Sequence, residues 1–296
     1  MNFIHKIKYS QNWNVGFCEQ TSQDFILTKA LKPITWMKHP YKDRWFTDPF
    51  ILKATGDEIV VFVEECSMDN PKGIICELVV DRRSMQMKKR YVLLELDTHL
   101  SYPAIIRYEG KVYVYPENGT SGKLNLYEYD EVNHQLLNPI CILDEAVADA
   151  TILEWQGHYY MVATKYPDTQ ERAFLYFSDS LFGPFAELND GPFQTNKICS
   201  RPGGGWICVE SGLYRPAQDC LERYGSALSI MKTFISNNEI NEDVVFSIQP
   251  QSKRYSEGIH TINYYQQLCV VDGYGFLFPK MKYVAYFVRR LKTLFA

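Results

Sequence analysis

The chain has 296 residues, of which 46% are apolar and 15% aromatic, and its formal net charge is −4. This composition excludes an intrinsically disordered chain, and the charge gives no global reason to expect nucleic acid as a partner. No stretch of about 18 apolar residues is present to span a bilayer, and the N-terminal segment lacks the continuous apolar region of a secretory signal. Eight scattered cysteines without C-x-x-C spacing suit a reducing compartment. We therefore expect a cytoplasmic protein.

Short runs rich in Val, Tyr and Phe dominate the chain, and each follows a polar or glycine turn such as Thr55-Gly56-Asp57. A second short apolar segment lies just upstream of each run, and the two together predict a β-hairpin. In chain order the predicted hairpins pair 48–53 with 58–65, 102–108 with 111–117, 149–155 with 158–164, and 260–265 with 267–273.

These units recur at a nearly constant interval. Aligned on the residue that opens the first strand, they begin at Asp48, Tyr102, Asp149, Arg201 and His260, which are 54, 47, 52 and 59 residues apart. Further strands at 75–81, 124–130, 174–179 and 227–233 supply outer strands. Four strands in about 50 residues are typical of a propeller blade. The sequence therefore predicts an all-β fold, a five-bladed β-propeller; a β-sandwich or two packed β-domains are the alternatives, and neither predicts this regular recurrence.

The predicted blades lie near 45–95, 99–145, 148–197, 200–250 and 258–275, and an N-terminal strand within 10–35 closes the last one. The tail KMKYVAYFVRRLKTLFA (280–296) places apolar residues on one face of a short helix, with basic residues beside them. Such a basic amphipathic helix lies in a membrane interface or docks on a protein, and both interpretations stay open. The first would hold the protein peripherally at the inner face of the membrane.

Residues that are equivalent by repeat converge at one mouth of a propeller's central channel. Here they are Asp48, Tyr102, Asp149, Arg201 and His260. A purely structural lining would be small or apolar, because unpaired charges are costly to bury. A ring of ionisable residues instead indicates a polar site in a pocket. The alternative is that these ions only pair with one another and close the channel.

Several stretches together resemble the N-terminal propeller domain of the glucosamine inositolphosphorylceramide transferase family. They are WFTDPF (45–50), HLSYP (99–103), DATILEWQGHYYMVAT (149–164), RPGG (201–204), LYRPAQDC (213–220), YG (224–225) and GIHTIN (258–263). The resemblance covers about residues 10 to 275, and LYRPAQDC followed by YG is its most specific part. In plant members a separate glycosyltransferase domain accompanies the propeller, so a catalytic propeller and an accessory one are both open.

That propeller family is in turn similar to the family 43 glycoside hydrolases. The resemblance implies a general-base Asp in the first blade, a pKa-modulating Asp in the third, a general-acid Glu in the fourth and a site His in the fifth. Asp48 matches the base, Asp149 the modulator and His260 the histidine, whereas Arg201 falls where the acid should be. Arginine cannot supply the proton that a sugar alkoxide needs in order to leave. The carboxylates considered as replacements are Glu257, Glu117 and Glu210.

A phosphate or nucleoside diphosphate leaving group needs a cation rather than an acid, and the arginine fork matches phosphate well. We therefore predict an anion clamp of Arg201, Arg215 and His260, beside the glycine run 203–205. Asp48 would activate an acceptor hydroxyl. The residues predicted to contact the sugar are Tyr102, Glu117, Asp149, Gln218, Asp219 and Glu257.

The predicted function is thus sugar transfer from a sugar nucleotide or sugar phosphate to a glycan or glycolipid acceptor, in surface glycan or glycolipid biosynthesis. A glycoside hydrolase or phosphorylase and a non-catalytic glycan-binding propeller are the alternatives. No metal ligand set is predicted, although a divalent metal near His260 stays open.

Overall fold

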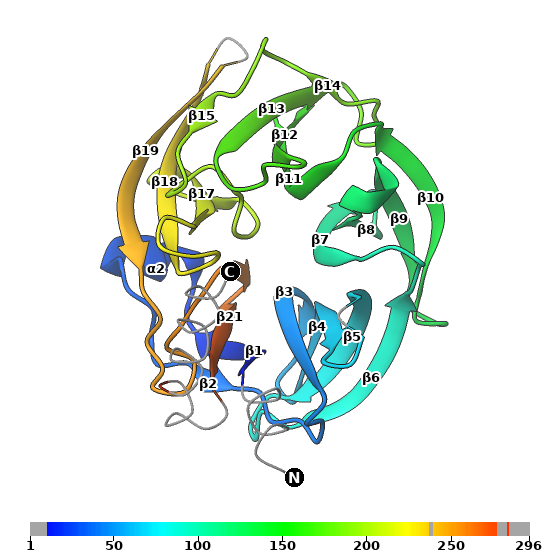
Figure 1. The fold of residues 1–296 in the computed structure, drawn as a ribbon, viewed down its shortest axis with the longest axis vertical. Helices are drawn as coiled ribbons and strands as arrows, with labels where there is room; N and C mark the ends of the chain where they lie inside the picture. The colour runs from blue at the N-terminus through cyan, green and yellow to red at the C-terminus, as the bar shows by residue number, and fades with distance from the viewer. Residues whose placement is uncertain (1–10, 71, 237–238, 277–282, 284–296) are drawn as a thin grey trace, which may run out of the picture.

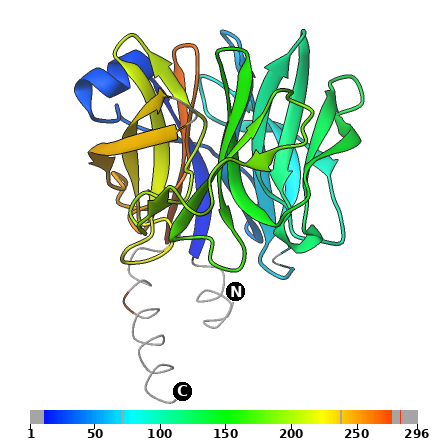
Figure 2. The same cartoon turned by 90° about the horizontal axis from the view of Figure 1, so that it is seen from above.

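The structure is a computed structural model, and it describes residues 11–70, 72–236, 239–276 and 283. Within these residues five antiparallel sheets surround a central axis, which confirms the predicted five-bladed β-propeller (Figure 1). Seen from the side, the sheets stand next to one another as the blades of a disc (Figure 2). No helix in the described part of the chain is long and apolar enough to cross a membrane. Apart from Tyr283, the predicted tail helix lies outside the described residues.

The first four blades follow the chain, with the innermost strand first. Blade one contains β3 (Arg44–Ala54), β4 (Glu58–Ser67), β5 (Ile74–Asp81) and β6 (Met87–Leu94). Blade two contains β7 (Ser101–Tyr108), β8 (Lys111–Glu117), β9 (Leu124–Asp130) and β10 (Gln135–Leu143). Blade three contains β11 (Val147–Trp155), β12 (His158–Lys165) and β13 (Arg172–Ser178), and β13 pairs with both β14 (Ala186–Glu187) and β15 (Gln194–Thr195). Blade four contains β16 (Ile207–Val209), β17 (Gly212–Asp219), β18 (Ala227–Ser236) and β19 (Glu239–Ile248).

Blade five joins the two ends of the described chain. Its inner strands are β20 (Ile262–Tyr265) and β21 (Leu268–Phe276), and its outer strands are β1 (Gln11–Glu19) and β2 (Thr35–Trp36). The register between β1 and β21 runs from Gln11 opposite Phe276 to Glu19 opposite Leu268. A helix, α2 (Ser22–Thr28), and a short 3-10 turn, η1 (Gly119–Ser121), complete the structure. The ring is therefore closed by main-chain hydrogen bonds between residues far apart in sequence.

Apolar side chains fill the spaces between neighbouring blades. Strand β4 is buried on both faces except at its ends, because blades pack against it from two sides, whereas the outermost strand β6 keeps exposed positions. Each pair of adjacent blades shares its own cluster of buried residues. The cluster between blades five and one, for example, combines Val15 and Phe17 with Phe46 and Val61. This packing holds the inner strands, and the residues at their ends, in fixed positions.

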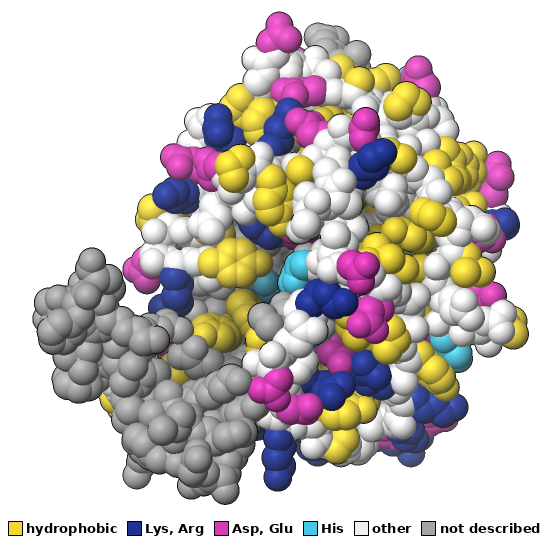
Figure 3. All heavy atoms as spheres, turned by 45° about the vertical axis from the view of Figure 1, so that its right-hand side comes forward, with side chains coloured by type: hydrophobic (Ala, Val, Ile, Leu, Met, Phe, Trp, Pro, Cys, Tyr) yellow, Lys and Arg dark blue, Asp and Glu magenta, His cyan; other side chains and the backbone are white. Residues whose placement is uncertain are grey.

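Charge on the surface is mixed. On the face turned toward the viewer in Figure 3, basic and acidic side chains alternate with hydrophobic ones. The small net charge of −4 thus reflects interspersed charges of both signs.

Candidate active site at the channel mouth

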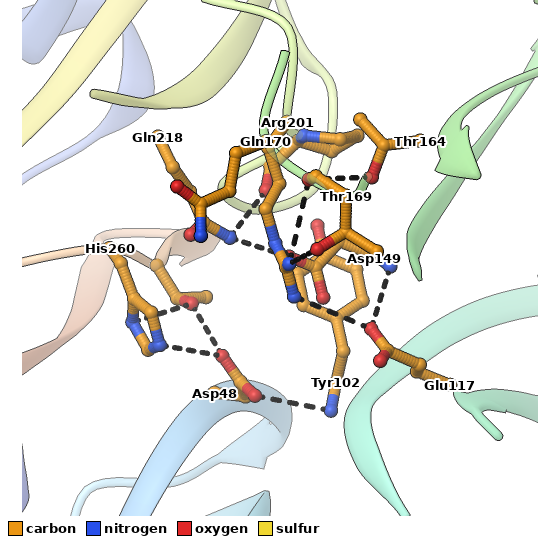
Figure 4. A network of polar contacts seen from close by, with 12 residues as sticks. Asp48, Tyr102, Glu117, Asp149, Thr164, Thr169, Gln170, Arg201, Gln218 and His260 are labelled. Carbon is orange, nitrogen blue, oxygen red and sulfur yellow. Dashed lines mark hydrogen bonds and ion pairs between the residues drawn. The ribbon is translucent and has the colours of Figure 1, made fainter. Parts of the chain in front are cut away.

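Three of the strand-opening residues share one unusual backbone conformation. Asp48, Tyr102 and Asp149 have φ angles of 49°, 46° and 49°, in the left-handed region that residues other than glycine rarely enter. At each of them a register shift interrupts the ladder between the first and second strands of the blade. Figure 4 shows the three residues lying around one mouth of the channel. They are therefore equivalent in backbone geometry as well as in sequence spacing, and strain of this kind concentrates at functional sites.

Blade four departs from this pattern. Arg201 was predicted to open the first strand, but β16 begins at Ile207. Between the two lie Pro202 and the glycines 203–205, and only Pro202 makes an isolated bridge, to Ala217. Proline cannot donate to a ladder and glycine weakens a strand, so this segment reaches the mouth as a loop.

Asp48 connects three blades by hydrogen bonds. Its Oδ1 accepts from Thr261 Oγ1 at 2.8 Å and lies 3.6 Å from His260 Nε2. Its Oδ2 accepts from the backbone N–H of Tyr102 at 3.2 Å. The buried carboxyl group of Glu64 also hydrogen-bonds with Asp48. An ionised carboxylate has about four lone-pair sites, so Asp48 keeps about one of them for the hydroxyl of a ligand.

A carboxylate behind His260 fixes the imidazole ring. Asp272 Oδ2 lies 2.6 Å from His260 Nδ1, and the backbone N–H groups of His260 and Thr261 donate to Asp272 Oδ1 at 2.9 and 3.1 Å. With its proton held on Nδ1, the ring directs Nε2 at Asp48. The indole of Trp13 stacks on the ring with a centroid distance of 4.1 Å. The imidazole therefore has one orientation, with Nε2 toward Asp48.

Burial and neighbouring charges shift the pKa values of this group. Burial disfavours the charged form of His260, but the carboxylates of Asp272 and Asp48 outweigh it and raise the pKa of the imidazole. Burial would raise the pKa of Asp272, but His260 outweighs it and lowers that pKa. Burial raises the pKa of Asp48 against the opposing charge of His260, and Asp149 adds to the rise. An imidazole of raised pKa thus faces a carboxylate of raised pKa, which favours proton transfer between a ligand and this pair.

Arg201 extends into the same mouth from blade four (Figure 4). Its Nε donates to Asp149 Oδ2 and its Nη1 to Thr169 Oγ1, both at 2.6 Å. Its Nη2 lies 3.6 Å from Glu117 Oε2, beyond hydrogen-bonding distance. The side chain is 10% exposed, and its Cζ lies 5.1 Å from the ring centroid of Tyr224. Asp149 and Thr169 therefore hold Nε and Nη1 by hydrogen bonds, and Nη2 faces Glu117 in a longer ion pair.

Asp149 is shared by two donors. Besides Arg201, Gln218 donates from Nε2 to Asp149 Oδ2 at 2.5 Å and to the Pro202 carbonyl at 2.8 Å. Burial raises the pKa of Asp149 to about 7 against the opposing charge of Arg201, and Glu117 adds to the rise. Gln218 Oε1 is buried and has no hydrogen-bond partner among the described residues. Such an orphaned acceptor indicates a missing donor, for example a ligand hydroxyl.

The channel is closed beneath the mouth. The hydroxyl of Tyr102 lies 2.9 Å from Thr151 Oγ1 and accepts from the backbone N–H of Gly204 at 2.8 Å. Gly204 has φ 135°, and a Cβ added there would lie 1.9 Å from the carbonyl oxygen of Ile262, so only glycine permits this approach. The Tyr102 ring is 1% exposed and packs edge-on against Phe50. Tyr102 therefore forms the floor of the mouth and does not offer a face to a sugar.

The structure corrects the predicted place of Arg215. Its side chain is 0% exposed, and its Nε and Nη2 donate to Glu242 at 2.8 and 2.5 Å. Nη2 also donates to the carbonyl of Cys199 at 2.8 Å. Side chains in the middle of a strand stand perpendicular to the sheet, so Arg215 points into the body of blade four and not along β17 to the mouth. The predicted pair of arginines does not form.

Two other residues that were predicted to contact the sugar bind protein groups instead. Asp219 Oδ1 accepts from the backbone N–H of Leu221 at 3.0 Å and so caps a turn. Glu257 accepts from Ser256 Oγ at 2.9 Å, and its Oε2 lies 3.9 Å from Arg223 Nη2.

Of the three carboxylates considered as replacement acids, one reaches the cluster. Glu117 accepts from the backbone N–H of Asp149 at 3.0 Å and from the hydroxyl of Tyr166. Glu210 lies exposed in the turn between β16 and β17, where its backbone N–H donates to Gln23. Glu117 belongs to the mouth because it ends the second strand of blade two, beside the bulge of the first.

Sequence reasoning missed several members of the site. Asp272 was the most detectable, because it is a lone acid inside the apolar run LCVVDG, and a charge buried in a strand requires a partner. Trp13 and Tyr224, which both pack against the ring of His260, gave no signal, since aromatic residues are frequent throughout the chain.

The site offers little room for a metal ion within its present hydrogen bonds. Asp48, His260 and Asp272 bring potential ligand atoms within 4.8 Å of one another. Asp272, however, already accepts from His260 Nδ1, Thr47 Oγ1 and the backbone N–H of Asp48, in addition to the two backbone groups named above. The donor set therefore fits a hydrogen-bonded network better than a metal centre.

Comparison with known proteins identifies the chain's relatives. The model of a family described as "Glucosamine inositolphosphorylceramide transferase 1, N-terminal" matches residues 26–267. The chain belongs to this family. The resemblance inferred from the sequence is confirmed, and the matched range contains Asp48, Asp149, Arg201 and His260.

Two named relatives show how much of the longer proteins this family member spans. Glucosamine inositolphosphorylceramide transferase 1 of Arabidopsis thaliana is 28% identical over 219 residues, which are 71% of this chain and 28% of that protein. The protein of the same name from Oryza sativa subsp. japonica is 25% identical over 198 residues, 65% of this chain and 26% of its own. The chain thus spans about a quarter of the length of the curated relatives it matches. Both relatives are named as transferases.

Solved structures of glycoside hydrolases share the fold. A thermostable family 43 glycoside hydrolase superposes with a TM-score of 0.53 and 13% identity over 70% of this chain and 77% of that one. A family 117 glycoside hydrolase from Zobellia galactanivorans covers 91% of both chains with a TM-score of 0.54 and 9% identity. At these identities the likeness concerns the propeller fold alone.

Proposed function

We propose that the channel mouth transfers a sugar from a phosphate-activated donor to a hydroxyl of a glycan or glycolipid acceptor. The observation that carries this proposal is the convergence of Asp48 and Arg201 on a single mouth (Figure 4), where Nη2 of Arg201 makes no contact shorter than its 3.6 Å ion pair with Glu117. An arginine stands where a hydrolase of related fold would need an acid, and it suits a leaving group that departs as an anion.

In the proposed reaction Asp48 removes the proton from the acceptor hydroxyl. The acceptor oxygen then forms a bond to the anomeric carbon, while the bond from that carbon to the phosphate oxygen breaks and the phosphate leaves with the electron pair. Raised basicity of Asp48 favours the first event. The guanidinium group of Arg201 and the imidazole of His260, whose pKa the neighbouring carboxylates raise, stabilise the charge of the departing phosphate.

The sugar would lie between these groups. Gln218 Oε1 supplies a buried acceptor for one of its hydroxyls. Tyr224 is 41% exposed and lies beside both Arg201 and His260, so its ring can pack on a face of the sugar. The predicted role of Asp149 changes accordingly: it orients Arg201 and Gln218 and is not the main contact of the sugar.

A membrane-bound acceptor fits the direction in which the chain leaves the propeller. The last described strand ends at Phe276, opposite Gln11, on the mouth side, since the backbone of Tyr274 bonds Glu257 and Gly258, just before His260. The basic apolar segment 280–296 follows. Binding of this segment to a membrane would bring the protein to the surface that holds a glycolipid acceptor, at the inner face of the membrane.

Glycoside hydrolysis is the second candidate, and Glu117 is the observation that favours it. This carboxylate lies 3.6 Å from Arg201 and bonds to the backbone of Asp149. It could deliver a proton to a leaving sugar oxygen if Arg201 moved aside. The present ion pairs oppose that movement.

A thermal-shift screen tests the proposal. Purified protein is heated with nucleotide sugars, sugar phosphates, inorganic phosphate or neutral glycans, with Arg201→Ala and the exposed-site control Arg83→Ala beside it. A ligand at 100 times its Kd stabilises by about 2.7 kcal/mol, so we expect a rise in Tm of a few degrees for wild type and Arg83→Ala with a phosphorylated donor. Stabilisation by neutral glycans alone, equal in Arg201→Ala, would contradict the proposal.

A further inference from the structure

A second cavity, of about 340 Å³, lies away from the channel, beside blade five. Residues 37–42 and Arg44, in the segment that leads from β2 to β3, form one wall, and Asn12 and Asn14 of β1 form another. The third wall is Arg254 and Tyr255, in the connection between β19 and β20.

Buried polar atoms without a partner line this cavity. Asn12 and Asn14 are 3% and 2% exposed, and the Oδ1 of each has no hydrogen-bond partner among the described residues. The orientation of Asn14 is fixed, because its Nδ2 donates to the Met37 carbonyl and to the Tyr255 hydroxyl, both at 2.9 Å. Nδ1 of His39 is likewise buried and unpartnered within the described residues. Three such atoms in one cavity require an explanation, since buried polar groups are otherwise paired.

Strand pleating separates this cavity from the channel mouth. Side chains alternate along β1, so Asn12 and Asn14 face one side and Trp13 faces the other. Trp13 stacks on His260. Strand β1 therefore contributes side chains to both the cavity and the channel mouth. A ligand in the cavity would not contact the imidazole of His260.

The charge around the cavity is positive. Lys38, Lys42, Arg44 and Arg254 line it, and none of the described residues that line it is a carboxylate. Arg44 is held by Asp43 and Glu65, whereas the other three cations make no ion pair within the described residues. Burial lowers the pKa of His39, and the charge of Arg254 lowers it further. The ring is then neutral at pH 7 and adds a hydrogen-bonding group without adding charge.

We propose that this cavity binds a polyhydroxylated anion of the sugar phosphate class. Hydroxyl groups of the ligand donate to Oδ1 of Asn12 and Asn14, and its phosphate lies against Lys42 and Arg254 at the rim. A neutral sugar would leave these cations unmatched, and inorganic phosphate would leave the amide oxygens unsatisfied. This cavity is separate from the channel mouth, and its proposed ligand does not depend on the reaction proposed there.

Isothermal titration with glucose 6-phosphate, inorganic phosphate and glucose tests this site. We expect saturable binding of glucose 6-phosphate to wild type, Arg83→Ala and Arg201→Ala alike. The double variant Lys42→Ala/Arg254→Ala should weaken it about tenfold or more, because hydrogen bonds to charged groups are lost. Both substituted side chains are exposed, so the fold should persist, which a melting curve checks.

A second variant separates the role of the amide oxygens from that of the charges. Asn12→Ala should reduce the preference for glucose 6-phosphate over inorganic phosphate and leave phosphate binding nearly unchanged. Absence of saturable binding of glucose 6-phosphate to wild type would overturn the proposal. So would binding that survives in Lys42→Ala/Arg254→Ala but disappears in Arg201→Ala, because the ligand would then occupy the channel mouth.

Discussion

Arg201 and Arg215 lie 14 residues apart in blade four and have different surroundings. Arg201 stands in a loop at the channel mouth, where Asp149 and Thr169 hold only part of its guanidinium group. Arg215 stands in the middle of β17, where Glu242 takes two of its donors. The difference shows that a residue outside the regular ladder, such as Arg201, can reach the mouth, whereas Arg215 in an unbroken part of β17 serves the packing within blade four.

Removing the partner of Arg215 should have the largest effect. Glu242→Ala leaves a guanidinium group buried and unpaired, which costs about 3–5 kcal/mol of folding stability. Urea unfolding measures this loss, and Glu239→Ala, on an exposed position of the same strand, should change stability by less than about 0.5 kcal/mol. Equal losses of stability in Glu242→Ala and Glu239→Ala would contradict the structural role given to Arg215, and with it the difference from Arg201.

Asp272→Asn should impair the reaction at the mouth with a smaller effect on stability. Without the carboxylate that raises the pKa of His260, the imidazole loses its proton at lower pH. We expect turnover to fall about 100-fold and the alkaline limb of the pH–rate profile to move to lower pH. A profile of unchanged shape would assign Asp272 a purely structural role, and Asp219→Asn, at the turn, serves as the control.

Arg201→Lys keeps the charge at the mouth but loses the planar fork. We expect binding of phosphorylated donors to weaken about tenfold, measured by calorimetry, with little change in melting temperature. Arg215→Lys should give the reverse pattern, a lower melting temperature with unchanged donor affinity. A weaker donor affinity in both variants would show that the two arginines act together after all.

The smallest expected effect is on the pH dependence of stability. Burial raises the pKa of Asp149 to about 7, so between about pH 4 and 7 the folded protein keeps a proton that the unfolded chain releases. Stability should therefore decrease as the pH rises through this range. Urea midpoints at several pH values should show a shallower slope in Asp149→Asn than in wild type. Identical slopes would mean that Asp149 ionises normally in the folded state.

The sequence predicted the propeller and most of the mouth for one physical reason. Blades repeat, and the bulge that turns Asp48, Tyr102 and Asp149 toward the axis occurs at the same point of each unit. Spacing therefore located these residues without any knowledge of their contacts. The same argument failed for Arg215, because spacing does not say on which face of a strand a side chain lies.

Contacts that form only when the first described strand pairs with the last blade could not be predicted from the sequence. Trp13 belongs to the first described strand and His260 to the last blade, and only the pairing of β1 with β21 brings them together. The unpartnered Oδ1 atoms of Asn12 and Asn14 depend on the same closure. Local patterns in the sequence carry no signal for such long-range neighbours.

A comparison of leaving groups in Arg201→Ala tests most directly whether this arginine receives the departing phosphate. Transfer rates are measured for a sugar 1-phosphate and for the corresponding glycosyl fluoride, with the sugar identified by the thermal-shift screen. We predict that Arg201→Ala slows transfer from the phosphate donor about 100-fold and slows transfer from the fluoride only a few-fold. Equal losses of transfer rate with both donors would contradict the proposed role of Arg201. They would favour a glycoside hydrolase or a glycan-binding function for the channel mouth.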